Sequence, residues 1–141
     1  SIARRQRQMC IRDRFNIAHN RKYSIDHLWY QEKDDEKIMV GISEFMGVEI
    51  GEVLRVILPQ AETMVDEGQD MFSLWTGDEK IAFTAPFSGT ITEVNGEVEI
   101  NPDLVNESAY DLGWILVLQP FQFDMENLLE PDEYVEYLSE L

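Results

Sequence analysis

The chain has 141 residues, of which 44% are hydrophobic, enough for one globular core but not for two. Its single cysteine, Cys10, excludes an intrachain disulfide and a thiolate cluster that could hold zinc or an iron–sulfur centre. The longest apolar run, residues 114–118, is far shorter than the roughly 18 residues that span a bilayer. These features favour a soluble protein of a reducing compartment: the cytoplasm, or the mitochondrion if the source is eukaryotic.

Charge is the most unusual property of the sequence. The chain carries 28 acidic and 11 basic residues, a net charge of −17. Seven of the basic residues lie within positions 1–22, so residues 23–141 hold only four against 27 acidic ones. Such a surface repels nucleic acids and anionic membranes, which bind through lysine and arginine. We therefore expect electropositive protein partners, although acidity also serves solubility.

Residues 1–22 differ in composition from the rest of the chain. They are rich in arginine and lack the apolar stretch of a secretory signal. The string at 5–14 resembles translated sequencing-adapter sequence, so a non-native leader is the first interpretation. A disordered basic arm is the second and a mitochondrial targeting peptide the third. We expect residues 1–22 to lie outside the folded domain.

The middle of the chain alternates short apolar runs with turn residues, a pattern typical of β-rich folds. Strands are predicted over 37–41, 51–58, 70–75, 80–85 and 90–94. Ser43 can cap a short helix that ends near Ile50. Glu67-Gly68 predicts a turn, and residues 76–79 predict the turn of a hairpin between 70–75 and 80–85. Asn101-Pro102 breaks the chain before one helical turn at 102–105.

The last part of the chain changes to helical spacing. Residues 114–118 predict the final core strand, which Pro120 ends. Two helical runs follow: Phe121, Met125, Leu128 and Leu129, then Tyr134, Tyr137, Leu138 and Leu141. Glu130-Pro131 is a favourable start for the second run. We expect a mainly β fold, a sandwich or flattened barrel with short helices, and a helical extension over 121–141.

The order of motifs resembles the H protein of the glycine cleavage system, a member of the lipoyl- and biotinyl-carrier hammerhead group. The collinear segments are YSIDHLW at 23–29, VGISEF at 40–45, GEV at 51–53, LP at 58–59, APFSG at 85–89, EVN at 93–95, NPDLVN at 101–106, Tyr110 and GW at 113–114. Leu28 departs from the family, which has glutamate there. The resemblance implies a lipoyl-type domain over 23–120, a barrel-sandwich hybrid that serves as a carrier and not as an enzyme.

The most important departure from the family falls at the position of the lysine that carries lipoate. The resemblance places the lipoyl lysine eleven positions before Gly89, and that position is Asp78, whose carboxylate cannot form the lipoyl amide. Lys80 is the nearest lysine and the alternative acceptor, because the period of two in a strand would point it the same way. Trp75 stands where the family has glutamate. It would either pack beneath the turn or anchor a partner.

Other candidate sites are weaker. His27 beside Asp26 could act as an oriented base, but a satisfied histidine at a strand start is the preferred interpretation. The acidic residues 34–36 lack the spacing and glycine of a calcium-binding loop, so we expect a solvated hairpin tip and no metal. Ser88 lies outside a Gly-x-Ser-x-Gly nucleophile elbow. The sequence therefore predicts no catalytic residues.

The leading hypothesis is an H-protein-like, non-catalytic acidic docking protein that carries no lipoate and needs no cofactor. The alternative is a working lipoyl carrier of glycine cleavage, or of a related lipoate-dependent pathway, modified at Lys80. Either protein would meet electropositive enzymes of such a pathway.

Overall fold

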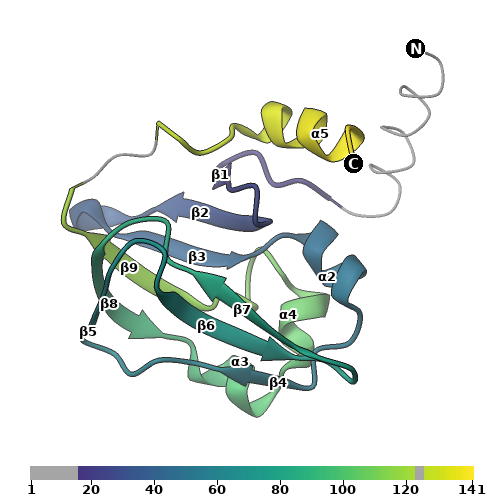
Figure 1. Ribbon diagram of the computed structural model, residues 1–141, viewed down its shortest axis with the longest axis horizontal. Coiled ribbons are helices and arrows are strands. Elements are labelled where there is room, and N and C mark those ends of the chain that lie inside the picture. The colour runs from purple at the N-terminus through teal and green to yellow at the C-terminus, as the bar shows by residue number, and fades with distance from the viewer. Residues whose placement is uncertain (1–15, 123–125) are drawn as a thin grey trace.

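The computed structural model describes residues 16–122 and 126–141. Two antiparallel sheets face each other, and one longer helix lies above them (Figure 1). The strands are β1 (Lys22–Tyr23), β2 (Leu28–Glu32), β3 (Ile38–Ile42), β4 (Arg55–Ile57), β5 (Thr63–Val65), β6 (Asp70–Trp75), β7 (Lys80–Thr84), β8 (Gly89–Val94) and β9 (Leu116–Pro120). The six-stranded sheet has the order β1-β2-β3-β9-β8-β5 and the three-stranded sheet the order β4-β6-β7. The predicted mainly β fold is confirmed.

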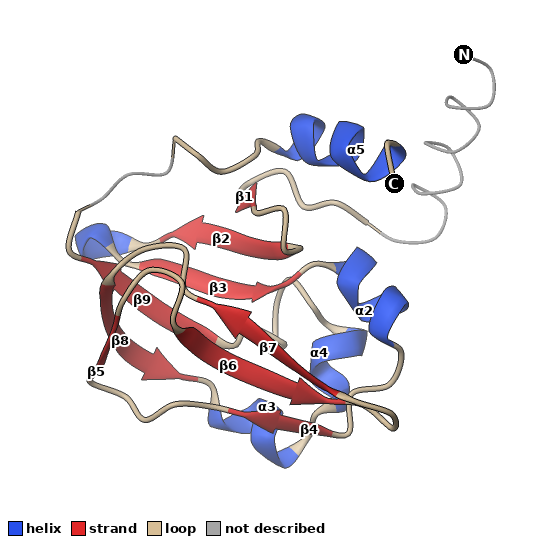
Figure 2. Cartoon of the chain, viewed as in Figure 1, coloured by secondary structure: helices blue, strands red, loops and turns tan. Residues whose placement is uncertain are grey.

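Helices occupy the edges of this arrangement. They are the 3-10 turn η1 (Asp34–Glu36), α2 (Glu44–Ile50), α3 (Gly96–Ile100), α4 (Asp103–Glu107) and α5 (Pro131–Ser139). The short helix α4 contacts both α2 and α3, and α5 runs along β1 (Figure 2). The helix predicted after Ser43 is confirmed as α2, because the Ser43 hydroxyl accepts a hydrogen bond from the backbone N–H of Met46.

The main core lies between the two sheets. Its buried side chains include Val40, Ile91, Leu116 and Leu118 from the larger sheet, and Phe72, Leu74 and Phe83 from the smaller one. Leu116 and Leu118 of β9, like Phe72 and Leu74 of β6, are two residues apart and so point to the same side of their strand. Phe72 and Phe83 stack with ring centroids 4.9 Å apart. Burial of each such side chain contributes roughly 1.5–3 kcal/mol, so this core holds the β6–β7 hairpin firmly on the larger sheet.

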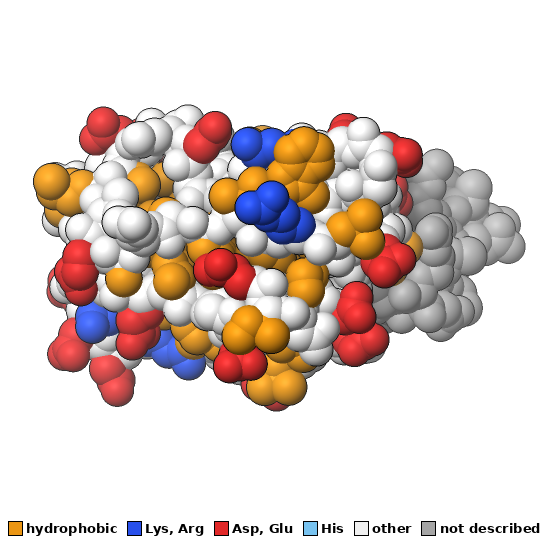
Figure 3. All heavy atoms as spheres, turned by 90° about the horizontal axis from the view of Figure 1, so that it is seen from below, with side chains coloured by type: hydrophobic (Ala, Val, Ile, Leu, Met, Phe, Trp, Pro, Cys, Tyr) orange, Lys and Arg blue, Asp and Glu red, His pale blue; other side chains and the backbone are white. Residues whose placement is uncertain are grey.

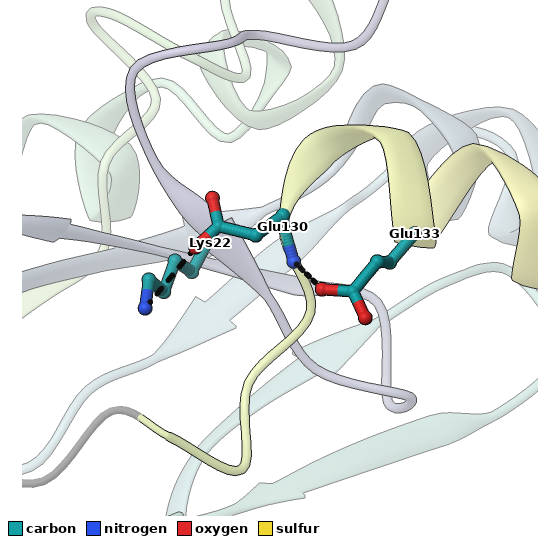
Figure 4. Close-up of polar contacts among 3 residues, drawn as sticks. All are labelled: Lys22, Glu130 and Glu133. Atoms are coloured by element: carbon teal, nitrogen blue, oxygen red, sulfur yellow. Dashed lines mark hydrogen bonds and ion pairs between the residues drawn. The ribbon is translucent and has the colours of Figure 1, made fainter.

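A second, aromatic cluster fastens α5 to the outside of the larger sheet. The rings of Tyr23 and Tyr134 stack with centroids 4.4 Å apart and an interplanar angle of 3°. Both side chains are fully buried, as is Trp29. Lys22 on β1 also forms an ion pair with the Glu130 carboxylate at 3.2 Å, while the Glu130 N–H donates to Glu133 (Figure 4). The exposed ion pair contributes little beside the stacked rings.

The segment 16–22 lies against the body of the protein. The Tyr110 hydroxyl donates to the carbonyl of Asn16 at 2.6 Å, and the Tyr23 hydroxyl donates to the carbonyl of Ala18 at 2.7 Å. The Arg21 guanidinium sits 4.4 Å from the centroid of the Trp29 ring. The remaining residues of the predicted leader, 1–15, lie outside the described residues. Residues 16–22 therefore have the contacts of a folded segment.

Element boundaries differ most from the sequence prediction at two strands, while β3, β7 and β8 differ from it by one residue at one or both ends. The predicted strand 51–58 is paired only over Arg55–Ile57, since Gly51 has a φ of +74° and the Val53 N–H donates to the Asn106 side chain. The last core strand begins two residues later than predicted, at Leu116. Asp70–Trp75 matches the predicted strand, and Gly68 occupies the predicted turn with a φ of +84°.

The prediction of helical spacing from Phe121 to Leu129 is wrong for the described residues of that stretch. Leu129 is extended and bridges Tyr23, with N–H to carbonyl distances of 2.8 and 2.7 Å in the two directions. Met125 lies outside the described residues. The helix begins only at Pro131. Leu128 and Leu129 therefore pack against the core clusters without forming a helix, while Phe121 is exposed.

Gly41 provides a test of the packing around Trp29. It pairs with Trp29 across β2 and β3, and an added Cβ would fall 2.5 Å from the indole ring. Gly41→Ala should therefore lower the free energy of unfolding by about 2 kcal/mol or more in denaturant titrations. Gly77→Ala is the control, because its Cβ would meet nothing within 4 Å. Equal stability of the two variants would contradict this packing.

Candidate functional site

The β6–β7 hairpin projects its turn, residues 76–79, from the smaller sheet (Figure 1). The Thr76 N–H donates to the carbonyl of Glu79 at 2.9 Å. The Thr76 hydroxyl also accepts hydrogen bonds from the N–H groups of Asp78 and Glu79, at 3.4 and 3.3 Å. Serine and threonine commonly close turns in this way. The turn is thus fixed by Thr76 and by the core beneath the strands, with no contribution from the side chain of residue 78.

Asp78 and Lys80 occupy different places in this hairpin. Asp78 is exposed within the turn. Lys80 is the first residue of β7 and lies directly opposite Trp75 in the register of the two strands. Directly paired residues place their side chains on the same face of a sheet. Lys80 therefore belongs to the strand and its exposed sheet face, whereas Asp78 belongs to the tip.

Trp75 ends β6 on the same exposed face, and 40% of its surface is accessible. Its carbonyl accepts a hydrogen bond from the Leu54 N–H at 2.8 Å. On its other side Arg55 of β4 lies directly opposite it. Sequence analysis did not single out Arg55. Its place beside Trp75 depends on the register of β4 on β6, which the sequence around Arg55 does not indicate.

A groove of about 470 Å³ runs along the edge of β7. It is lined by Ile25, Asp26, His27, Met46, Ile81, Ala82, Phe83 and Thr84. Most of these side chains are apolar, and the two titratable ones come from the loop before β2. Asp26 and His27 could act as an acid–base pair in this groove only if the imidazole of His27 had no other hydrogen-bond partner.

His27 is instead engaged in a hydrogen-bonded chain. Its Nδ1 lies 2.9 Å from the Tyr134 hydroxyl, which lies 2.8 Å from the Ser43 hydroxyl. Ser43 in turn caps α2. Burial lowers the pKa of His27 below 6.5, and the charges of Asp26 and Glu49 oppose that shift in part. The predicted satisfied histidine directly before a strand is confirmed, and the chain it joins positions α5.

The acidic residues 34–36 form the exposed η1 turn between β2 and β3, as predicted for a hairpin tip. Within the described ranges no group of three or more histidine, cysteine, aspartate or glutamate side chains is arranged to hold a metal ion. In the same part of the chain no helix has the length and apolar character of a membrane span.

The geometry defines a class of protein: a β-rich domain that presents an exposed hairpin turn from a core of two facing sheets. Comparison with known proteins identifies the family. The profile of the Glycine cleavage H-protein family matches residues 21–141. The chain therefore belongs to that family, whose proteins are carriers and not catalysts.

Individual relatives agree with this assignment. The glycine cleavage system H protein of Halalkalibacterium halodurans is 35% identical over 126 residues, which cover 89% of this chain and 98% of that protein. The H protein of Aliivibrio salmonicida is 35% identical over 120 residues, covering 84% and 95%. The crystal structure of an H protein from Mycobacterium marinum superposes with a TM-score of 0.78 at 27% identity, covering 86% and 98%. The predicted hammerhead fold is thus confirmed.

The pKa of His27 predicts a dependence of stability on pH. Partial burial lowers the pKa of folded His27, so around and below pH 6.5 the unfolded chain binds more protons than the folded chain at this residue. Stability should therefore fall as the pH drops from about 7.5 to about 5.5. His27→Asn, which tolerates the φ of +69°, should reduce this fall in denaturant titrations.

His19→Asn is the matched control, because His19 is an exposed histidine outside the hydrogen-bonded chain. It should leave the pH profile unchanged. A profile that His27→Asn does not flatten would show that other groups determine this dependence.

Proposed function

We propose that this chain is an acidic, non-catalytic docking protein of the H-protein type that carries no lipoate. The observation that carries the proposal is Asp78 at the exposed tip of the hairpin. The sequence resemblance assigns the attachment lysine to this position. Lipoate is held through an amide to a lysine amine, and a carboxylate offers no nitrogen for that bond.

The position of Lys80 argues against the alternative of a working carrier modified there. Lys80 lies after the turn, within β7, and faces the same side as Trp75. A lipoyl ligase requires its lysine at the tip of a hairpin, and the two residues from 78 to 80 would shift an acceptor along an extended strand by about 6–7 Å. Trp75 would also place a large ring beside the acceptor amine. Both features favour an unmodified protein without a cofactor.

The surface supports electropositive partners. The helices α2 to α4 and the loops beside them carry exposed acids and no basic residue: Glu49, Glu52, Glu97, Glu99, Asp103 and Glu107. We call these six residues the acidic helical face. Unlike charges accelerate and orient encounters between proteins. Enzymes of glycine cleavage, or of another lipoate-dependent pathway in the cytoplasm, are the partners that this proposal implies.

Lipoylation gives the most direct test of the proposal. When the chain is coexpressed with a lipoyl ligase and supplied with lipoate, intact-mass measurement should find no added lipoyl group on the native protein. Asp78→Lys should gain the lipoyl mass, because the hairpin already presents residue 78 to solvent. The gain can be incomplete, since Trp75 replaces the family's glutamate.

Lys80→Arg is the control for the alternative acceptor. Arginine keeps the positive charge but cannot be acylated in this way. Lipoylation of the native chain that Lys80→Arg abolishes would overturn the proposal and make this protein a working carrier.

Salt dependence tests the electropositive partners. Binding to the glycine cleavage enzymes of Halalkalibacterium halodurans, measured by calorimetry, should weaken as salt rises, because exposed charges are screened beyond about 10 Å at 0.1 M. Glu99→Lys with Glu107→Lys should weaken binding most at low salt. Asp66→Lys with Glu67→Lys, in the exposed turn after β5, makes the same charge change elsewhere. Salt-independent affinity would indicate an apolar interface.

A further inference from the structure

Three exposed side chains form a row across the smaller sheet. Arg55 of β4 pairs with Trp75 of β6, and Trp75 pairs with Lys80 of β7. Because directly paired residues share a face, the indole lies between two cations with Cβ spacings of about 5 Å on each side. We call these three residues the cation–indole strip. Trp75 and Lys80 of the strip lie immediately before and after the hairpin turn that holds Asp78.

The charge of the strip is opposite to that of its surroundings. Arg55 and Lys80 are two of only four basic residues after residue 22. Among the described residues neither side chain forms an ion pair or hydrogen bond, although the chain has 28 acids to offer. Figure 3 shows the same contrast on one face of the molecule, where basic side chains lie against a hydrophobic patch and acidic ones are spread around.

Lys33 and Lys37 differ from the strip in their setting. They flank η1, whose residues 34–36 are all acidic and include no aromatic residue. Arg55 and Lys80, by contrast, flank a tryptophan that is 40% exposed. Lys80 also follows the two acids of its own turn, Asp78 and Glu79. Tryptophan and arginine are the residues that most often dominate the binding energy of protein interfaces.

We propose that the cation–indole strip binds a short acidic segment of a partner protein, with carboxylates on Arg55 and Lys80 and an apolar side chain on Trp75. This inference does not depend on whether lipoate is attached. The protein would then have two docking sites of opposite charge: the acidic helical face for electropositive partners, and the basic strip for an acidic segment.

The charge of the whole protein selects this occupant over others. A second copy of the chain brings a net charge of −17 toward an equal charge, which opposes self-association. A nucleic acid would extend its phosphates from the strip over the acidic body. A short segment can place its carboxylates on Arg55 and Lys80, while the repulsion from acids more than about 8 Å away is screened at physiological ionic strength.

The probe is a short peptide of alternating glutamate and leucine with blocked ends, followed by nitrogen–proton correlation NMR on the full chain. It should shift the indole N–H signal of Trp75, identified by its loss in Trp75→Phe, and the amide signals of Arg55 and Lys80. The indole signal of Trp29 should stay in place, because that N–H is buried and donates to the carbonyl of Ala109. A peptide that shifts no strip signal overturns the proposal.

Charge reversal distinguishes binding at the strip from the general effect of the protein's net charge on an acidic peptide. Arg55→Glu with Lys80→Glu should weaken peptide binding at least about five-fold. Lys33→Glu with Lys37→Glu makes the same change of net charge beside η1, at the opposite end of the molecule from the β6–β7 turn (Figure 1), and should weaken it about two-fold or less. Unchanged signals elsewhere show that each variant is folded. Equal effects of the two pairs, or equal shifts from a lysine–leucine peptide, would overturn the proposal.

Discussion

The buried indole of Trp29 is the contact on which the arrangement of this molecule depends. Its ring covers Gly41 on the neighbouring strand, where no Cβ could fit. Its N–H donates to the carbonyl of Ala109 at 2.9 Å, and the Arg21 guanidinium lies over the ring. One side chain thereby joins β2, β3, the loop after α4 and the first described residues. A larger sheet fixed in this way provides the surface on which the smaller, hairpin-bearing sheet packs.

Elements whose structure depends on residues within or next to them were predictable from the sequence. The strand Asp70–Trp75 and the turn at Thr76 follow from apolar alternation and turn residues. Helix α2 follows from the Ser43 cap. The candidate site was predictable for the same reason, because Asp78, Lys80 and Trp75 lie within one hairpin whose register is set by its own sequence.

Features that depend on distant residues were not predictable in this way. Leu129 fits a helical spacing, but its backbone pairs with Tyr23, more than a hundred residues earlier. The strip through Arg55 required the register of β4 on β6, which no local signal contains. Helix α3 was missed although a signal was present: the Asn95 side chain accepts a hydrogen bond from the Glu97 N–H and caps the helix. The positions of Leu129 and Arg55, in contrast to that of α3, therefore depend on pairing with distant strands.

The hairpin also explains how the fold and the chemistry of an H protein can be separated. Its strands are held by Phe72, Leu74 and Phe83 in the core, and its turn by the Thr76 hydroxyl. None of these contacts involves the exposed side chain of residue 78. A substitution there costs the fold almost nothing, because surface positions outside packed or hydrogen-bonded groups rarely change stability by more than about 0.5 kcal/mol. A chain can therefore keep the whole hammerhead scaffold while it loses the amine that makes the scaffold a carrier. The family's fold thus depends on the residues of the core, whereas lipoylation depends on one side chain at the tip of the hairpin.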